Sequence, residues 1–532
     1  MARTLFILQV FLLLIFPASC AKKASIENVV LISLDTTRAD HVDSGRGARA
    51  RTPELRRFAS QAIVFDNAFC TIPQTLPSHL SIFSGRDPHE LGVFGNEYVY
   101  DGRYPLLAEV LKEKGWRTTA VVSLGTVAAS CGINRGFESY FDHLSEATQF
   151  FAPAAKVTDT ALSLLERLKK EKFFLFVHYS DPHPPYAPPA AKADFCISLD
   201  DRPLTTFNAY SGAILRLKIP LRPGTHRLHL AVSALPGIFD SFVIRRLETR
   251  PASRITLENI SFTKALYNGS HILSGHEGSV TLLCPKACEL KIFQIIPQLG
   301  LSATLENYRL EVEYLDAQVG RLLQRLAAEK LLEKTAVVIF ADHGEGLGER
   351  ERYVGHVRFL NRPSIHVPLF VRLPGVDHGR IKTPVSLKGI APTLLALLSI
   401  ASPSFSSSLN LLPARGAKHS LPETIASFTF TPAAEVDRCS LIRWPWQLII
   451  NRASPPDDEE TREYYDLRFG ASRKLEAIAP EVIRENDPSA FGCFERLRPL
   501  WQAAFLRRKR FPPNAKAAQL DKLKTLGYIR QP

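Results

Sequence analysis

Residues 28–34, NVVLISL, followed by Asp35-Thr36-Thr37-Arg38, decide the fold of this 532-residue chain. A short, unbroken apolar run with β-branched residues predicts a strand that is buried on both faces. Such strands are typical of the parallel sheets of α/β proteins, in which functional side chains gather where strands end in loops. Asp35 stands at such a point, so the first strand already offers a candidate site residue.

The same pattern recurs along the chain. Further strand-like runs occupy residues 117–122, 173–179, 335–341 and 367–373. Helical patterns occupy residues 53–62, 106–114, 158–170, 304–330 and 388–398. Because strands alternate with helices, we expect an α/β fold with a mostly parallel sheet between helices, built from residues 25–190 and 304–430.

Residues 191–303 interrupt this pattern. They show no helical period, and their short alternating runs at 213–219, 226–232, 241–247 and 279–284 are separated by Pro and Gly. This predicts an inserted antiparallel β domain. Residues 431–532 are expected to form a small C-terminal α+β subdomain, with strands at 441–451 and 463–467 and a helix at 515–526.

The start of the chain, from Met1 to Cys20, predicts an export signal. Arg3 precedes an uncharged apolar stretch of about 12 residues, shorter than the ~20 that a transmembrane helix needs, and small residues then lead to Cys20. Two outcomes stay open: cleavage near Ala21, or a lipid anchor on Cys20, since the residues before it are similar to a bacterial lipobox. Both predict an exported protein of the periplasm or cell envelope.

The composition is that of a globular protein, with 45% hydrophobic and 22% charged residues. The formal net charge of +13 invites a nucleic-acid interpretation. However, the basic residues are scattered, and the densest run, LRRKR at 506–510, lies near the end of the chain. We therefore expect no nucleic-acid partner.

Two other predicted strands also end in ionisable side chains. Asp342-His343 closes the run at 335–341, and Asp181-Pro182-His183 follows the run at 173–179. The carboxyl ends of parallel strands meet at one edge of a sheet, so these groups should converge with Asp35. Each Asp or His alone is weak evidence, but carboxylates and imidazoles together predict a divalent metal site.

Residues 75–85, TLPSHLSIFSG, predict a helix that begins near Thr75, because Pro77 fits a first helical turn. The free backbone N–H groups and the positive end of that helix favour a tetrahedral anion in front of Thr75. A bound metal could also ionise the Thr75 hydroxyl and make it a nucleophile. The alternative is that Thr75 only caps the helix.

Taken in order, these motifs resemble those of the sulfatases of the alkaline phosphatase superfamily. The resemblance covers roughly residues 26–190 and 304–530. Further matching stretches are Thr52-Pro53-Glu54-Leu55, Arg86-Asp87-Pro88-His89, Tyr314-Leu315-Asp316, Leu347-Gly348-Glu349, Gly355-His356, Val367-Pro368-Leu369, Tyr465-Asp466-Leu467 and LKTLGYI at 523–529.

The resemblance implies an alkaline-phosphatase-like fold and a metal-dependent ester hydrolase. It implies that Asp35, Asp342 and His343, together with Thr75, hold a divalent cation, with Ca²⁺ the first expectation and Mn²⁺ or Zn²⁺ also open. Thr75 then stands at the nucleophile position. The implied substrate is a small-molecule, glycan or lipid ester.

The same resemblance implies that His183 and His356 contact substrate oxygens or the leaving group. In that role either imidazole could serve as the general acid, since imidazoles titrate near neutral pH.

Several positions depart from the family pattern. Sulfatases usually carry a Cys or Ser that is converted to formylglycine where this chain has Thr75, so no formylglycine is expected. His79 replaces an Arg, Ser123 and Gly125 align with a Lys and a His, and Thr36 stands where a second Asp ligand is common. Without that Arg and Lys the site should hold a sulfate ester less tightly, so the resemblance does not by itself imply the usual sulfatase mechanism.

Two hypotheses of different classes follow. The first is an exported, metal-dependent hydrolase of sulfate, phosphate or phosphonate esters with Thr75 as nucleophile, a threonine chemistry found elsewhere in the superfamily; phosphotransfer belongs to the same chemistry. The second is a catalytically silent envelope protein that binds glycans or other envelope components through its β insert.

Overall fold

The computed structural model of the chain describes residues 25–142, 151–184, 186, 188–189, 193–208, 217–234, 241–245, 248–251, 254–258, 260–263, 270–274, 277–292, 294–298, 301–412, 424–430, 436–453, 460–468, 477–508 and 514. The expected export signal with Cys20, the expected helix at 515–526 and the LKTLGYI stretch lie outside these residues. Within them, no helix has the length and apolar character needed to cross a bilayer.

The centre of the molecule is an eight-stranded sheet. In spatial order its strands are β24 (Gly379–Ile381), β2 (Ile63–Phe65), β23 (Leu369–Arg372), β19 (Thr335–Phe340), β1 (Asn28–Leu34), β6 (Phe173–Tyr179), β4 (Arg117–Val122) and β5 (Ser139–Phe141). β19, β1, β6, β4 and β5 run parallel, while β23 is antiparallel to both of its neighbours. The predicted α/β fold with a mostly parallel sheet is confirmed.

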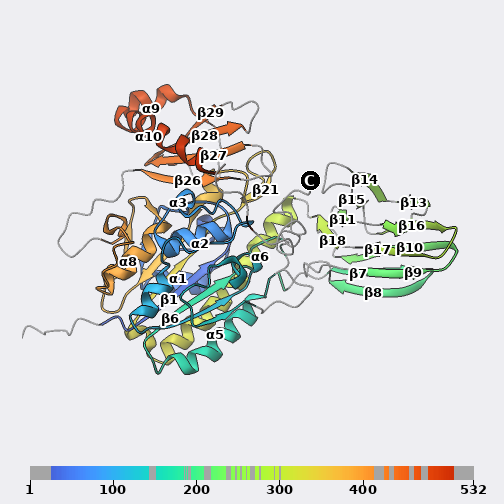
Figure 1. The fold of residues 1–532 in the computed structure, drawn as a ribbon, viewed down its shortest axis with the longest axis horizontal. Helices are drawn as coiled ribbons and strands as arrows, with labels where there is room; N and C mark the ends of the chain where they lie inside the picture. The colour runs from blue at the N-terminus through green and yellow to red at the C-terminus, as the bar shows by residue number, and fades with distance from the viewer. Residues whose placement is uncertain are drawn as a thin grey trace, which may run out of the picture.

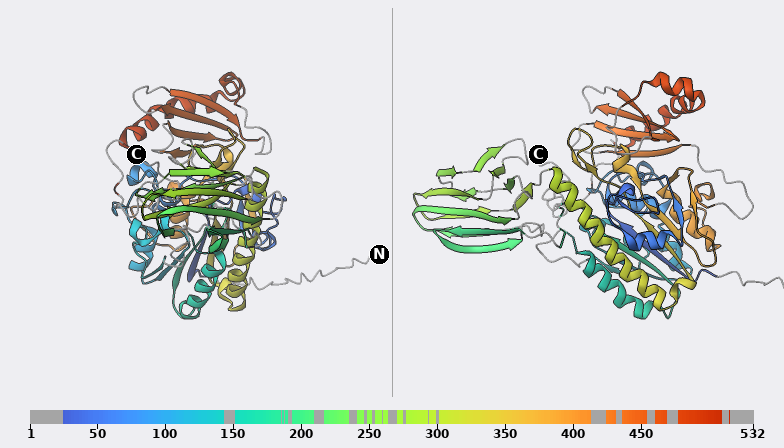
Figure 2. Two further views of the ribbon diagram at one scale, coloured as in Figure 1. Left: turned by 90° about the vertical axis from the view of Figure 1, so that its right-hand side faces the viewer. Right: turned by 180° about the vertical axis from the view of Figure 1, so that it is seen from behind.

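Helices cover the sheet on both sides (Figures 1 and 2). One group packs α1 (Pro53–Ala59) and α5 (Ala154–Leu168) against the long α6 (Leu301–Ala328). In the other group, α2 (Thr75–Ser84) contacts α3 (Pro88–Leu91), α4 (Leu107–Glu113) and α8 (Ile390–Leu397).

The three central strands hold the core. β1, β6 and β19 are buried at every position. Each fully buried Val, Leu, Ile or Phe side chain contributes roughly 1.5–3 kcal/mol relative to exposure. The carboxyl ends of these strands are therefore fixed points on which side chains can be positioned.

The insert forms three antiparallel sheets beside the N-terminal end of α6 (Figure 1). They contain β7 (Ala193–Leu199), β8 (Arg202–Asn208), β9 (Leu217–Leu221), β10 (Gly224–Ala234), β11 (Ser241–Arg245), β12 (Glu248–Arg250), β13 (Arg254–Glu258), β14 (Ile260–Thr263), β15 (Ser270–Ser274), β16 (Glu277–Cys284), β17 (Cys288–Ile292) and β18 (Gln294–Gln298). Buried residues such as Leu228, Val280 and Leu290 form the interior of this insert. The large core of the α/β part contains none of its described residues.

The C-terminal part of the chain forms a four-stranded antiparallel sheet. Its strands, in order, are β26 (Ile425–Thr429), β27 (Val436–Arg443), β28 (Trp446–Ala453) and β29 (Glu460–Asp466). Two helices that the sequence did not predict, α9 (Pro480–Asn486) and α10 (Pro488–Arg508), follow it. Phe428 and Trp501 meet edge to face between α10 and the sheet.

Two of the predicted strands are wrong in extent. The run at 441–451 is a hairpin of β27 and β28, which turns at Trp444-Pro445. The run at 367–373 belongs to two sheets: β22 (His366–Val367) pairs with β3 (Ala68–Phe69), and β23 joins the central sheet. In both cases a proline, Pro445 or Pro368, lacks the N–H that would continue the ladder.

Candidate active site at the carboxyl edge of the sheet

The predicted site residues come together because β19, β1 and β6 are adjacent and parallel. Their registers place Ser33 beside Phe340 and Leu34 beside Tyr179. The Asp35 N–H donates to the Tyr179 carbonyl at 2.9 Å, which ties the ends of β1 and β6 together. The residues that follow the three strands therefore share one edge.

Helix α2 begins at Thr75, as the sequence predicted, and ends at Gly85 in the left-handed region. Two contacts hold its start at the sheet edge. Ser78 Oγ donates to the Asp342 carbonyl at 2.7 Å, and the Leu76 N–H donates to Asn96 Oδ1 at 2.9 Å. The buried Thr75 hydroxyl lies 3.5 Å from His343 Nε2.

Three fully buried side chains form a compact set of metal-ligand type. Ligand atoms of Asp35, Asp342 and His343 all lie within 4.8 Å of one another. His343 Nε2 is 3.5 Å from Asp35 Oδ1 and 3.4 Å from Asp342 Oδ2. All four carboxylate oxygens of Asp35 and Asp342 lack hydrogen-bond partners. Buried carboxylates without partners are costly, so this set fits a divalent cation.

Burial controls the ionisation of this set. Burial raises the pKa of Asp342 well above its usual range, and the nearby charge of Asp35 adds to the effect. For Asp35, burial opposes ionisation, but His178 and His343 outweigh it and lower its pKa. Burial lowers the pKa of His343 to about 3, so its imidazole is neutral and able to act as a ligand near pH 7.

His183 and His356 lie beside this set. The His356 ring centroid is 4.4 Å from that of His343 and 5.3 Å from that of His183. His183 Nδ1 lies 2.7 Å from the Pro184 carbonyl, so Nδ1 carries the proton and donates it there. Burial lowers the pKa of both side chains, for His356 to about 4. The structure thus brings together the six residues to which the family resemblance assigns a role, whereas Asp181 Oδ1 accepts the Ala154 N–H at the start of α5 at 2.9 Å.

Sequence reasoning missed a role for Glu345. This fully buried carboxyl lies 3.3 Å and 3.2 Å, through its two oxygens, from His356 Nδ1. Burial raises its pKa well above the usual range. Its place shortly after His343 in the Asp-His-Gly-Glu stretch was visible in the sequence, but its contact with His356 was not.

His178 was missed as well. It lies inside β6, in a run that reads as plain core, yet its Nε2 is 3.5 Å from Asp35 Oδ2. The side chain is fully buried, and neither ring nitrogen makes a hydrogen bond. A histidine near the end of an otherwise apolar strand was the available signal.

The positions that depart from the family pattern are occupied by neutral hydrogen-bonding groups. His79 Nδ1 donates to the Thr75 carbonyl at 2.7 Å, and Nε2 of the neutral ring accepts from Ser33 Oγ at 2.8 Å. Ser123 Oγ contacts Ser180 Oγ and donates to the Ala152 carbonyl at 3.0 Å. Within the described residues, no Lys or Arg forms an ion pair with Asp35 or Asp342.

Comparison with known proteins adds independent findings. The family model for sulfatases matches residues 27–400. An N-acetylglucosamine-6-O-sulfatase of Bacteroides thetaiotaomicron is 22% identical over 447 residues, which cover 74% of this chain and 73% of that protein. A choline-sulfatase of Rhizobium meliloti is 21% identical over 395 residues, which cover 70% and 68%.

A solved structure supports the same fold. The phosphonate monoester hydrolase from Silicibacter pomeroyi matches with a TM-score of 0.54 at 15% identity, over 92% of this chain and 96% of that chain.

Proposed function

The chain belongs to the sulfatase family and is an ester hydrolase, and from this premise we propose that it is an exported, metal-dependent hydrolase in which Thr75 attacks a sulfate or phosphorus ester. One observation carries the proposal. The Thr75 hydroxyl lies at the start of α2, 3.5 Å from His343 Nε2, and His343 adjoins two buried aspartates whose four carboxylate oxygens have no hydrogen-bond partner.

Asp35, Asp342, His343 and Thr75 would hold the cation. Bound there, a divalent cation would stabilise the ionised hydroxyl and the charge of the reacting ester group. Members of the family generally use a divalent metal, and Ca²⁺ is the ion implied by resemblance. The donor set, however, contains an imidazole and few oxygens, which suits Mn²⁺ or Zn²⁺ better than the six to eight oxygens that Ca²⁺ typically takes.

Thr75 would act as the nucleophile. Its oxygen forms a bond to sulfur or phosphorus while the ester oxygen departs, and water later cleaves the Thr75 ester and restores the hydroxyl. The positive end of the α2 dipole favours the charge that accumulates on the anion's oxygens, while the N–H groups of Leu76 and Ser78 are already bonded to Asn96 Oδ1 and the Gln74 carbonyl. No formylglycine is needed, because threonine is itself an alcohol nucleophile.

His356 or His183 would deliver the proton to the leaving oxygen. A protonated Glu345, consistent with its raised pKa, donates to His356 Nδ1 and leaves the His356 proton on Nε2. Near pH 7 both imidazoles are neutral in the free protein, because burial lowers their pKa. Each can therefore deliver a proton only after it has taken one up together with the anionic substrate, and it returns to the neutral imidazole when the leaving oxygen is protonated.

Export and anchoring belong to the same proposal. The apolar stretch from Met1 to Cys20 would direct the chain to the periplasm or envelope, where it stays soluble after cleavage near Ala21 or is held by lipid on Cys20. Metabolic labelling with a tagged fatty acid and a Cys20→Ala control distinguishes the two outcomes.

The decisive experiment is a parallel hydrolysis assay. Purified protein is offered nitrophenyl sulfate, phosphate monoester, phosphodiester and phosphonate, each with Ca²⁺, Mn²⁺ or Zn²⁺. We expect turnover of at least one ester, loss of about 1,000-fold in Thr75→Ala and retention of activity in Thr75→Ser, which keeps the hydroxyl. Thr160→Ala, whose hydroxyl bonds a helical carbonyl on α5, is the matched control.

The assay can also reject the proposal. Metal-independent turnover, or turnover unaffected in Thr75→Ala, excludes the threonine mechanism. Silence on all four esters under every metal supports the silent glycan-binding protein instead.

A further inference from the structure

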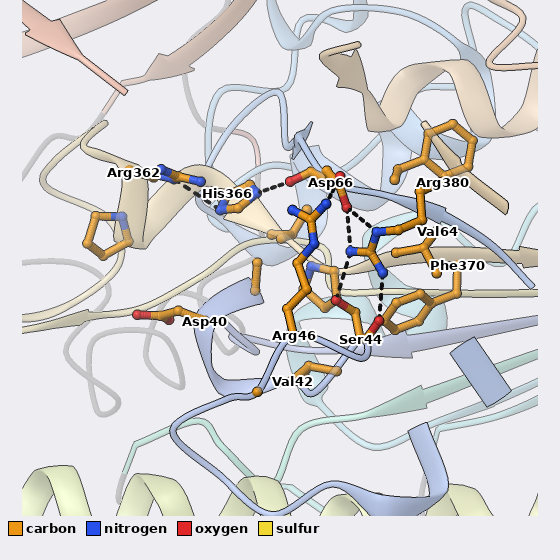
Figure 3. Close-up of a pocket in the computed structure, with 16 residues that line it drawn as sticks. Asp40, Val42, Ser44, Arg46, Val64, Asp66, Arg362, His366, Phe370 and Arg380 are labelled. Carbon is orange, nitrogen blue, oxygen red and sulfur yellow. Dashed lines mark hydrogen bonds and ion pairs between the residues drawn. The ribbon is translucent and has the colours of Figure 1, made fainter. Parts of the chain in front are cut away.

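A hollow lies at the same edge of the sheet as the candidate active site, and nothing in the proposed function uses it. Its volume is about 240 Å³. The walls come from the loop at 39–47, β2 with Asp66, helix α7 (Arg362–Ile365), β22, β23 and Arg380 of β24 (Figure 3). In the sheet order β24-β2-β23-β19-β1, it stands over the outer strands, while the candidate active site stands over the inner ones.

Two of its three arginines share one aspartate. Arg380 Nε donates to Asp66 Oδ1 at 3.0 Å, and Arg380 also reaches the Ser44 carbonyl at 2.7 Å. Arg46 Nη2 forms an ion pair with Asp66 Oδ2 at 3.0 Å. Figure 3 shows both guanidiniums directed at Asp66. One carboxylate thus faces two cations.

The other carboxylate of the wall, Asp40, is already engaged by residues outside the hollow. Arg38 Nε and Nη2 each donate to one Asp40 oxygen at 2.8 Å. Arg49 Nε lies 3.4 Å from the same group. The charge of Asp40 is therefore already matched by two other arginines.

Among the described residues, Arg362 is the arginine of the hollow that forms no ion pair, and the charge of Asp40 acts on it only at longer range. It donates to the Leu467 carbonyl at 2.6 Å and to His366 Nδ1 at 3.2 Å, and both acceptors are neutral. His366 donates its own Nε2 proton to the Asp66 carbonyl at 3.0 Å. Over the described part of the chain, Arg362 makes no ion pair with a carboxylate. A partly buried guanidinium without an anion is costly, and an anion in the hollow relieves that cost.

We propose that this hollow binds a small oxyanion, a carboxylate or sulfate group, on the guanidinium of Arg362 with Arg46 at the rim. The planar fork of a guanidinium matches the paired oxygens of such groups. The volume is below that of a typical drug-sized site, so it suits one anionic group rather than a large ligand.

Helix α7 connects the hollow with the candidate active site, so the anion could come from either of two sources. The carbonyls of Pro363 and Ser364 accept the N–H groups of Glu345 and Gly344 at 3.1 Å and 2.9 Å, so α7 directly supports the loop of the candidate active site. The oxyanion is either a free ion or a second anionic group of the ester substrate. Both present the same chemistry to Arg362.

Selenate, a sulfate surrogate with anomalous scattering, tests the site in crystals of the full chain. We expect a selenate peak in the hollow of the wild type, its loss in Arg362→Gln, and its retention in Arg321→Gln, a control at an exposed ion pair on α6. Equilibrium dialysis of sulfate with chelator-treated protein should show about tenfold weaker binding in Arg362→Gln.

Arg46→Gln is a second test variant whose fold should be unaffected, because the Arg46 side chain is 58% exposed. It should weaken sulfate binding by roughly threefold, as expected of a screened rim charge. The absence of a selenate peak in the wild type, or a peak that persists in Arg362→Gln, overturns the proposal. Neither readout requires turnover, so they remain decisive if the chain is catalytically silent.

Kinetics identify the source. A nitrophenyl ester is compared with the same ester built on a uronic acid. If the substrate supplies the oxyanion, Arg362→Gln lowers kcat/KM by about tenfold for the uronic acid ester only. If a free ion is the ligand, Arg362→Gln changes kcat/KM by the same factor for both esters.

Discussion

The central sheet and the inserted sheets bury their strands in different ways. β1, β6 and β19 are buried at every position, whereas β17 alternates between buried and half-buried residues and β16 alternates between buried and more exposed residues from Val280 onward. The central strands therefore have no face in water, and their polar groups gather at the carboxyl edge. The insert places its polar groups on its surface, as an antiparallel sheet with one wet face does.

Histidines make the difference concrete. His79, His178, His343 and His356 are buried in the α/β part, and burial lowers the pKa of His79, His343 and His356. In the insert, His226 is 16% exposed and hydrogen-bonded to Asp200 at 2.7 Å, which raises its pKa. Neutral imidazoles and unpaired carboxylates that are buried at one place lower the stability of the α/β part. Such a concentration of destabilising groups is typical of a functional site.

The largest expected effect comes from Asp342→Asn. Removing one metal-ligand charge should lower hydrolysis by about 1,000-fold, because a catalytic cation contributes several kcal/mol. In chelator, the same variant should unfold at a higher temperature than the wild type, because a neutral amide replaces a carboxyl whose ionisation is opposed by burial and by Asp35.

Activity assays and thermal scans with Asp159→Asn as the control, an exposed residue on α5, measure both effects. If Asp342→Asn keeps its activity, the compact set is not a metal site, and the contrast with the insert loses its functional meaning.

The pH dependence of stability should have opposite signs in the two regions. His366, in the α/β part, has its pKa lowered to about 3 by burial and by Arg362. As pH falls below about 6.5, unfolded chains take up this proton and native ones do not, so the wild type loses about 1–2 kcal/mol by pH 5. His366→Gln should therefore cost less stability at pH 5 than at pH 7.

His226 should behave in the reverse sense. Its raised pKa means that protonation stabilises the folded insert, and this contribution is lost as pH rises. His226→Gln should therefore lower the stability of the insert more at pH 5 than at pH 7. Hydrogen exchange resolved by region measures both variants, and equal signs in the two regions would contradict the contrast.

The sequence predicted the parts of the site that follow from local patterns and one topological rule. Apolar runs located β1, β6 and β19, and the rule that parallel strands end at one edge brought Asp35, Asp342 and His183 together. Thr75 was located by the helix pattern that contains Pro77 in its first turn.

What escaped prediction depends on long-range contacts. His178 looks like a core residue until the structure places it beside Asp35, which follows a different strand far earlier in the chain. Arg362 has no recognisable motif, and its lack of a counter-ion is visible only once Asp40 and Asp66 are assigned to other arginines. Local periodicity carries no information on such partners.

Excision of the insert should have the smallest effect. Replacing residues 193–298 by a short Gly/Ser linker removes no residue of the candidate active site and none of the described large core. Hydrolysis of a nitrophenyl ester should change by less than about threefold, within the range of distant, independent changes. If hydrolysis falls by more than about tenfold while the unfolding temperature of the α/β part is unchanged, the insert contributes to the geometry of the active site. A loss confined to extended glycan esters would instead assign the insert to substrate binding, leaving the chemistry wholly to the edge of the central sheet.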